Sequence, residues 1–127
     1  MLEKLKKVNN NSYSPYSNFK VSAIAVMKDN VEFCGVNVEN ASYGATICAE
    51  RSAILSAVSN GYKKGDFEKL YVYVPQDKCS TPCFVCRQVI HEFFDKDKEV
   101  ICLSNNEEKV YTVAELCPYP FDESDLK

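Results

Sequence analysis

Three cysteines and one glutamate, carried by two short segments, place the strongest constraint on how this chain can fold. The segments are Cys48-Ala49-Glu50 and Pro82-Cys83-Phe84-Val85-Cys86. Three thiolates can hold a zinc ion and leave its fourth tetrahedral position free for water, which distinguishes a catalytic zinc site from a closed structural one. We therefore expect the two segments to meet, with Cys48, Cys83 and Cys86 as metal ligands and Glu50 as the catalytic group that moves protons beside them.

Both segments are expected at the starts of helices. The pattern predicts a helix over Cys48–Asn60 that stops at Gly61, and Thr81-Pro82 as the N-cap and first-turn proline of a second helix. Helix N-termini carry partial positive charge, which favours thiolate over thiol. Because residues two apart point away from each other inside a helix, Cys48 must lie at the very start of its helix if Glu50 is to face the metal.

The remaining pattern predicts a mixed α/β fold. A short amphipathic helix is expected over Met1–Asn9, and a hairpin over Phe19–Met27 and Val31–Val38. Compact strands at 70–74 and 100–103 alternate with the two helices, and Thr112 with Glu115 forms a capping box for a short C-terminal helix. This order indicates a mixed central sheet covered by helices on both faces. The order of the strands does not follow from the sequence.

Length, charge and cysteine usage narrow the classes of function. The chain has 127 residues, enough for one domain spanning 1–127. Its net charge is −3 and it lacks the basic stripe of a polynucleotide binder, so we expect a small neutral substrate and no nucleic acid. The chain has no signal-like or membrane-length apolar segment, and seven is an odd number of cysteines. We therefore expect no membrane association, no disulfides and a cytoplasmic location.

Four motifs in order resemble those of the small homotetrameric cytidine deaminases. They are Tyr13-Ser14-Pro15-Tyr16-Ser17-Asn18-Phe19, Asn37-Val38-Glu39-Asn40, Cys48-Ala49-Glu50-Arg51 and Pro82-Cys83-x-x-Cys86-Arg87-Gln88. The resemblance covers residues 13–121 and implies a three-layer α-β-α sandwich with one Zn²⁺ per chain. It also implies hydrolytic deamination of cytidine and 2′-deoxycytidine to uridine and 2′-deoxyuridine plus ammonia, in pyrimidine salvage. The assembly implied is a homotetramer with shared active sites.

The resemblance assigns roles to further residues. Asn37 and Glu39, expected on one face at the end of the second strand, would bind the ribose. Phe19 would pack on the base, and Arg51 would donate to the sulfurs of the zinc ligands. The remaining assignments are residues that would reach the active site of a neighbouring subunit in the tetramer, namely Ala41, Tyr43 and Phe121.

Two alternative functions remain open. The first is a deaminase of a modified cytosine nucleoside such as blasticidin S, although the Asn37–Asn40 run and Phe121 favour the ordinary nucleoside. The second is a non-catalytic module with a closed structural zinc and Cys79 as a fourth ligand. Glu50 beside the metal would then have no purpose, and a buried carboxylate is costly without one.

Several other residues are expected to play no part in the chemistry. His91, the only histidine, lies roughly 140° around the helix from Cys86 and is not expected to bind the metal. Phe84 stands where the family commonly has glycine, and it either crowds the pocket or points outward. The four cysteines outside the motifs are expected to be small buried hydrophobic residues: Cys34, Cys79, Cys102 and Cys117.

Overall fold

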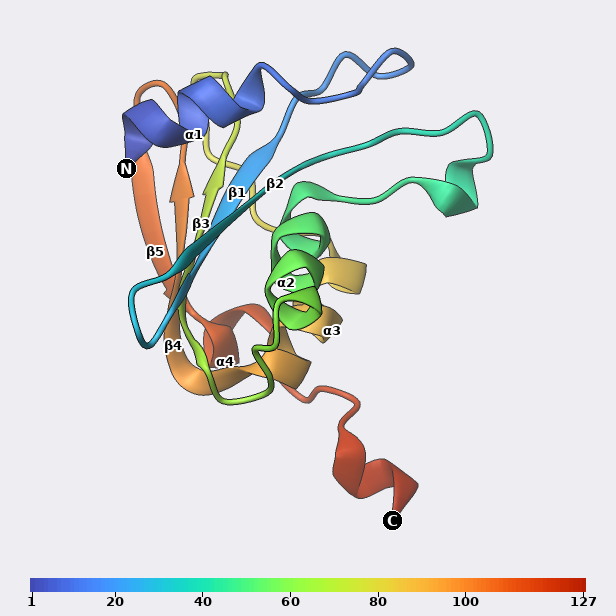
Figure 1. Cartoon of the computed structure of the whole chain (residues 1–127), viewed down its shortest axis with the longest axis vertical. Helices are drawn as coiled ribbons and strands as arrows, with labels where there is room; N and C mark the ends of the chain where they lie inside the picture. Colours follow the sequence, from blue (N-terminus) through green and yellow to red (C-terminus); the bar gives the residue numbers. More distant parts are fainter.

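A five-stranded mixed sheet forms the centre of the molecule, with the strand order β2-β1-β3-β4-β5 (Figure 1). The computed structural model describes all residues 1–127. The strands are β1 (Ser22–Met27), β2 (Glu32–Val36), β3 (Phe67–Tyr73), β4 (Phe94–Leu103) and β5 (Glu108–Thr112). Only β3 and β4 run parallel, and the other neighbouring pairs are antiparallel.

Helices cover both faces of this sheet. The amphipathic helix α1 (Leu2–Asn9) packs on one face, where Leu5 contacts a small cluster that includes Ile24. The opposite face carries the larger core, formed with α2 (Ala49–Ser59), α3 (Phe84–Phe93) and α4 (Val113–Leu116). All six residues of β1 are buried because both of its faces are covered. The expected three-layer α-β-α sandwich is confirmed.

Most predicted elements are present, and the differences have physical reasons. Strand β5 was not predicted because its side chains are largely exposed and polar, as is common on an edge strand. The predicted strand at 100–103 is shorter than β4. The first half of β4, Asp95–Glu99, is charged and lacks the apolar pattern on which the prediction relied. It begins at Phe94, directly after the last residue of α3, so no loop separates the helix from the strand.

The predictions of Thr81 as a helix N-cap and of Pro82 as a first-turn proline are wrong, since both residues precede the N-cap of α3. Helix α3 has Cys83 as its N-cap and begins at Phe84, because the Thr81 hydroxyl accepts a hydrogen bond from Arg87 rather than from the helix backbone. The predicted end of α2 is confirmed, since Gly61 follows the helix with a φ of +97°. The capping box of Thr112 and Glu115 at the start of α4 is also confirmed.

Backbone contact between β2 and α2 fixes how deeply that helix sits. A Cβ atom on Gly35 would lie 2.4 Å from the nitrogen of Ala53 and 2.5 Å from the carbonyl oxygen of Ala49. No side chain fits at such distances unless the helix moves, so glycine at this position allows β2 and α2 to pack this closely. The contact places the first turn of α2, and with it the Cys48–Glu50 segment, close against the sheet.

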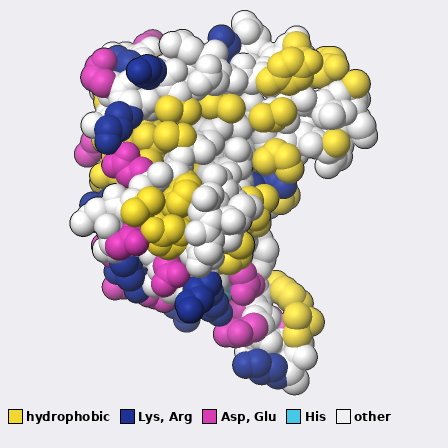
Figure 2. Space-filling model, in the orientation of Figure 1, with side chains coloured by type: hydrophobic (Ala, Val, Ile, Leu, Met, Phe, Trp, Pro, Cys, Tyr) yellow, Lys and Arg dark blue, Asp and Glu magenta, His cyan; other side chains and the backbone are white.

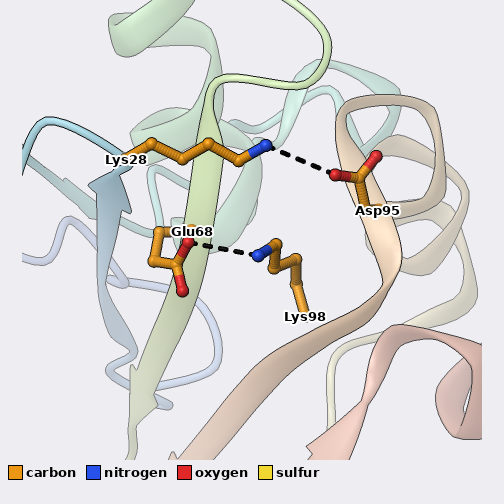
Figure 3. Close-up of polar contacts among 4 residues, drawn as sticks. All are labelled: Lys28, Glu68, Asp95 and Lys98. Atoms are coloured by element: carbon orange, nitrogen blue, oxygen red, sulfur yellow. Dashed lines mark hydrogen bonds and ion pairs between the residues drawn. The ribbon is translucent and has the colours of Figure 1, made fainter.

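Two ion pairs bridge the surface of the sheet to β4. Lys28, at the turn after β1, lies 3.4 Å from Asp95, and Glu68 on β3 lies 3.2 Å from Lys98 (Figure 3). Both pairs are partly exposed to solvent, and such pairs contribute about 0–1 kcal/mol each. The buried apolar clusters therefore hold the fold together. No helix has the length and apolar character needed to cross a membrane.

Candidate metal centre and active site

The three cysteines predicted as metal ligands lie together. Their Sγ atoms are all within 4.8 Å of one another, and those of Cys48 and Cys83 are 3.8 Å apart. Zinc–sulfur bonds of about 2.3 Å in a tetrahedral arrangement place neighbouring sulfurs about 3.8 Å apart. The thiol cluster therefore fits a zinc ion.

Helix starts position two of the three thiols. Cys48 is the N-cap of α2 and Cys83 is the N-cap of α3, both with extended backbone and neither with a side-chain capping bond. Cys86 lies in the first turn of α3 and is fully buried. Because Cys48 precedes its helix, Glu50 lines the same pocket as Cys48, which satisfies the geometric requirement of the sequence.

Hydrogen bonds to the Cys48 sulfur favour its thiolate form. The contact with the Cys86 thiol, followed by those with Arg51 and Cys83, lowers the pKa of Cys48 to about 5. The pKa of Cys86 is raised, first by the same hydrogen bond and then by burial. Nη2 of Arg51 lies 3.5 Å from Sγ of Cys48, and Nε of Arg51 is buried without a partner. One thiol of the cluster, that of Cys48, is thus favoured in the anionic form that binds metal.

Glu50 lies almost completely inside the protein, with 5% of its surface exposed. Burial raises the pKa of its carboxyl to about 7. A group with that pKa both accepts and donates protons readily near neutral pH.

The pocket in front of Glu50 has a volume of about 190 Å³ and mainly apolar walls. Phe19 lines it and is 43% exposed, so its ring is available to a ligand. Several lining residues were missed by the sequence analysis, namely Val21, Thr46, Ile47, Val72, Val74, Ser80 and Thr81. Of these, only Thr81 carried a local signal, because it stands two residues before a predicted ligand.

Asn37 lines the same pocket and is 8% exposed. It lies just beyond the end of β2, not within that strand as expected, in a segment that bridges to Tyr13 and Ile47 through Val38. Its Oδ1 accepts hydrogen bonds from Ser12 and from the backbone of Val21, and its Nδ2 donates to the Phe19 carbonyl at 2.7 Å. One N–H of the amide remains for a ligand.

Glu39 lines a second pocket of about 200 Å³, and Thr46 lines both pockets. One carboxylate oxygen accepts from the backbone nitrogens of Tyr16 and Ser17, at 2.9 and 3.1 Å, and the other accepts from the Ser17 hydroxyl. These bonds, led by that of the Ser17 hydroxyl, lower the pKa of Glu39. Three of about four acceptor positions are therefore occupied, which leaves one for a ligand hydroxyl.

The three residues expected to reach a neighbouring subunit differ in whether they line a pocket of their own chain. Tyr43 lines the pocket of Glu39 and is 83% exposed. Ala41 and Phe121 line neither pocket of their own chain, and both are exposed. The carbonyl of Phe121 accepts a hydrogen bond of 2.6 Å from Gln88 of α3.

Phe84 and Cys79 both turn away from the metal centre. Phe84 is 74% exposed and does not line the pocket, so it points outward rather than crowding the substrate. Sγ of Cys79 donates to the Cys102 carbonyl at 3.1 Å and stands outside the thiol cluster. A closed site with four cysteine ligands is therefore not formed.

The remaining minor expectations are mostly confirmed. His91 is half-buried on α3 and stands outside the thiol cluster. Cys102 is buried, and Cys79 and Cys117 are partly buried. The expectation for Cys34 is wrong, because it lies exposed on the edge strand β2.

A three-layer α-β-α sandwich that brings three thiols and a buried carboxylate to one small pocket defines a zinc-dependent hydrolase. Residues 1–104 match the family model described as the cytidine and deoxycytidylate deaminase zinc-binding region. The chain therefore belongs to the cytidine and deoxycytidylate deaminase family, and its cofactor is one zinc ion.

Individual proteins agree with this assignment. The chain is 36% identical to the cytidine deaminase of Mycoplasma genitalium over 125 residues, which cover 98% of the chain and 95% of that relative. It is 39% identical to the cytidine deaminase of Mycoplasma pneumoniae over 115 residues, covering 89% and 85%. The crystal structure of cytidine deaminase from Burkholderia pseudomallei superposes with a TM-score of 0.90 at 40% identity and covers 94% of both chains.

Proposed function

We propose that this protein hydrolyses cytidine and 2′-deoxycytidine to uridine and 2′-deoxyuridine, with release of ammonia, as a step of pyrimidine salvage. The observation that carries the proposal is the burial of Glu50 in the same pocket as Cys48 and Cys83. A buried carboxylate without an ion-pair partner costs stability, so its retention is best explained by chemistry.

Cys48, Cys83 and Cys86 hold the zinc ion in this proposal, and Arg51 donates to the Cys48 sulfur. When bound, zinc supplies a water molecule whose pKa is lowered from about 15.7 towards 7, so that hydroxide becomes available at neutral pH. The Arg51 guanidinium offsets part of the negative charge of three thiolates and holds the sulfur of Cys48 in place.

Glu50 moves the protons of the reaction. It takes a proton from the attacking water and delivers it to N3 of the cytosine ring, while the water oxygen forms a bond to C4. It then transfers the second proton of the water to the departing 4-amino group, so that ammonia leaves and the oxygen remains as the 4-carbonyl. A pKa of about 7 suits a carboxyl that must alternate between base and acid.

The side chains proposed to bind the ribose and base have few hydrogen-bonding positions left for a ligand. Phe19 packs on the base from the wall of the pocket. The free N–H of Asn37 donates to a ribose oxygen, and the remaining acceptor position of Glu39 receives a ribose hydroxyl. This donor and acceptor pair recognises sugar hydroxyls better than a charged group.

The walls of both pockets favour a nucleoside over a nucleotide. No lysine or arginine lines either pocket, whereas Glu39 and Glu50 each line one. A 5′-phosphate would need cationic or backbone N–H partners to offset its charge. Deoxycytidylate is therefore expected to be a poor substrate.

We further propose that the protein works in the cytoplasm as a homotetramer with shared active sites. Two projections flank a hollow whose rim carries apolar side chains (Figure 2). Exposed aromatic residues on the projecting segments support this assembly, namely Tyr43 at 83%, Phe121 at 58% and Tyr119 at 101% exposure. In the tetramer Ala41, Tyr43 and Phe121 would contact the substrate of a neighbouring subunit.

One assay with four substrates tests the function. The zinc-loaded protein is mixed with cytidine, 2′-deoxycytidine, deoxycytidylate or blasticidin S, and the loss of the cytosine absorbance band and the release of ammonia are followed. Turnover of the first two is expected. Turnover of blasticidin S or deoxycytidylate alone would redirect the substrate assignment, and inactivity towards all four would contradict the proposal.

A further inference from the structure

Arg87 makes an unusual set of contacts for a helix residue. Its guanidinium donates from Nε to the Pro82 carbonyl at 2.7 Å, from Nη2 to the Thr81 hydroxyl at 2.8 Å and from Nη1 to the Leu116 carbonyl at 3.0 Å. Its Cζ lies 4.3 Å from the centroid of the Phe84 ring. One side chain thus joins α3, the loop before α3 and the end of α4.

The loop that Arg87 holds is the one that carries Cys83. Thr81 and Cys83 both line the active-site pocket, and Pro82 between them is buried. Cys86 is fixed within the helix, but Cys83 precedes the helix with extended backbone and no side-chain capping bond. The backbone nitrogen of Arg87 donates to the Cys83 carbonyl at 2.9 Å, which ties only the backbone of Cys83 to the helix. The separation of the two thiols therefore also depends on what holds residues 81–83 against α3.

We propose that Arg87 is a positioning residue for the metal centre, whose planar guanidinium fixes the 81–83 loop against α3 and so sets the place of Cys83. The inference rests on the zinc site of the proposed function but not on the identity of the substrate. Lysine cannot replace this arrangement, because its single ammonium lacks the rigid fork that reaches several acceptors at once.

Phe84 completes the arrangement in this chain. Its ring lies over the guanidinium and covers one face of it, which favours the conformation that reaches Pro82 and Thr81. A glycine at this position would offer no such cover. The outward orientation of Phe84 therefore has a use in this chain.

Zinc retention tests the role of Arg87 without reference to activity. Arg87→Lys and Arg87→Gln holoproteins are mixed with a chromogenic zinc chelator well below their melting temperatures. Loss of a residue that orients metal ligands typically lowers metal affinity about 10–100-fold, and zinc release is expected to be faster than in the unchanged protein by up to about that factor. Lys28→Gln, which removes a cation from a surface ion pair (Figure 3), is the control and should release zinc at the original rate.

A second measurement separates positioning from general stability. Zinc-loaded Arg87→Lys is treated with an alkylating agent, and the labelling of Cys83 should rise relative to the control. A lower melting temperature with unchanged zinc release and unchanged Cys83 labelling would overturn the proposal. If neither Arg87 variant folds, Phe84→Ala replaces them, with several-fold faster release expected and an unchanged rate counting against the role.

The two proposals fail in different ways. A protein that retains zinc through Arg87 but deaminates no nucleoside contradicts the proposed function alone. A protein that deaminates cytidine and keeps its zinc normally in Arg87→Lys contradicts the positioning role alone.

Discussion

Glu50 combines a carboxylate with nearly complete burial at the N-terminal end of α2. Its replacement by glutamine keeps the size and removes the ability to shuttle protons. Glu50→Gln is expected to retain one zinc per chain and to lose at least about 10²–10⁴-fold in turnover. Metal analysis and the absorbance assay measure the two quantities on the same sample.

An exposed carboxylate provides the matched control for this change. Glu68 lies on β3 and pairs with Lys98 at the surface (Figure 3), so Glu68→Gln should leave both zinc content and turnover unchanged. Substantial activity in Glu50→Gln would remove Glu50 from the mechanism.

The lowered pKa of Cys48 predicts how its alkylation depends on pH. In reduced protein stripped of zinc, its pKa of about 5 makes it a thiolate at neutral pH, whereas burial raises the pKa of Cys102 to about 12. Because the thiolate is the nucleophile, iodoacetamide at about pH 6 should label Cys48 and spare Cys102. Labelling of Cys48 should decline only as the pH falls through about 5.

Peptide mass mapping of the alkylated protein gives the rate for each cysteine. Arg51→Gln should move the midpoint for Cys48 upwards, because one of the donors to its sulfur is lost. A midpoint near that of an ordinary thiol, about 8.5, in the unchanged protein would contradict the polarised cluster.

At the scale of the elements, Gly35 allows β2 and α2 to touch. Gly35→Ala places a methyl group against the backbone of Ala49 and Ala53, and the helix must move away. The expected loss is about 1–3 kcal/mol in the free energy of unfolding, as for other overpacked positions, with weaker zinc retention. Chemical denaturation and chelator competition measure the two effects.

Gly44 is the matched control, because a Cβ added there meets no atom within 4 Å. Gly44→Ala should therefore leave the free energy of unfolding unchanged. Equal stability of the Gly35 and Gly44 variants would show that β2 and α2 are not held as closely as described.

The sequence reveals those elements whose signals are local. The amphipathic α1, the Gly61 stop and the Thr112–Glu115 capping box depend on neighbouring residues and were predicted correctly. Strand β5 acquires its structure from pairing with β4, and the charged Asp95–Lys98 segment of β4 is an irregularity without a register partner in β3 or β5. No local pattern in the sequence reveals either feature. Thr81 was wrongly predicted as a cap because its hydrogen-bond partner, Arg87, lies six residues later in the chain, beyond the reach of the capping pattern.

The residues of the candidate site also fall into those with a local sequence signal and those without one. The thiols and Glu50 follow from motif spacing and helix-end geometry. Asn37 and Glu39 were expected to share one face of a strand, but the turns of the chain before β1 occupy most of their hydrogen-bonding capacity. Val72 and Val74 carry no signal because an apolar residue that lines a pocket resembles one that fills a core.

At the scale of the whole molecule, shared active sites can be tested by mixing inactive chains. The Phe121→Ala protein should lose activity because each chain lacks the aromatic ring that it contributes to the neighbouring active site. The Glu50→Gln protein should lose activity because it lacks the group that transfers protons. Refolded together, they should recover activity, since a Phe121→Ala chain keeps Glu50 and receives an intact Phe121 from its neighbour.

Native mass spectrometry of each variant checks that assemblies of four chains form and exchange. A mixture that stays as inactive as its components, although mixed tetramers are present, would place each active site within a single chain. A monomer in solution would contradict the tetramer itself.

The chain passes directly from α3 into β4, where Phe94 pairs with Phe67 before the irregular Asp95–Lys98 segment begins. A single residue inserted after Phe93 would turn the helix by about 100° relative to the strand, or force the strand out of register. Cys86 and Arg87, which both lie on α3, would then move away from the metal site together. The length between α3 and the Phe94–Phe67 pair is consequently restricted, and a residue inserted within Asp95–Lys98 should be tolerated better than one inserted directly after Phe93.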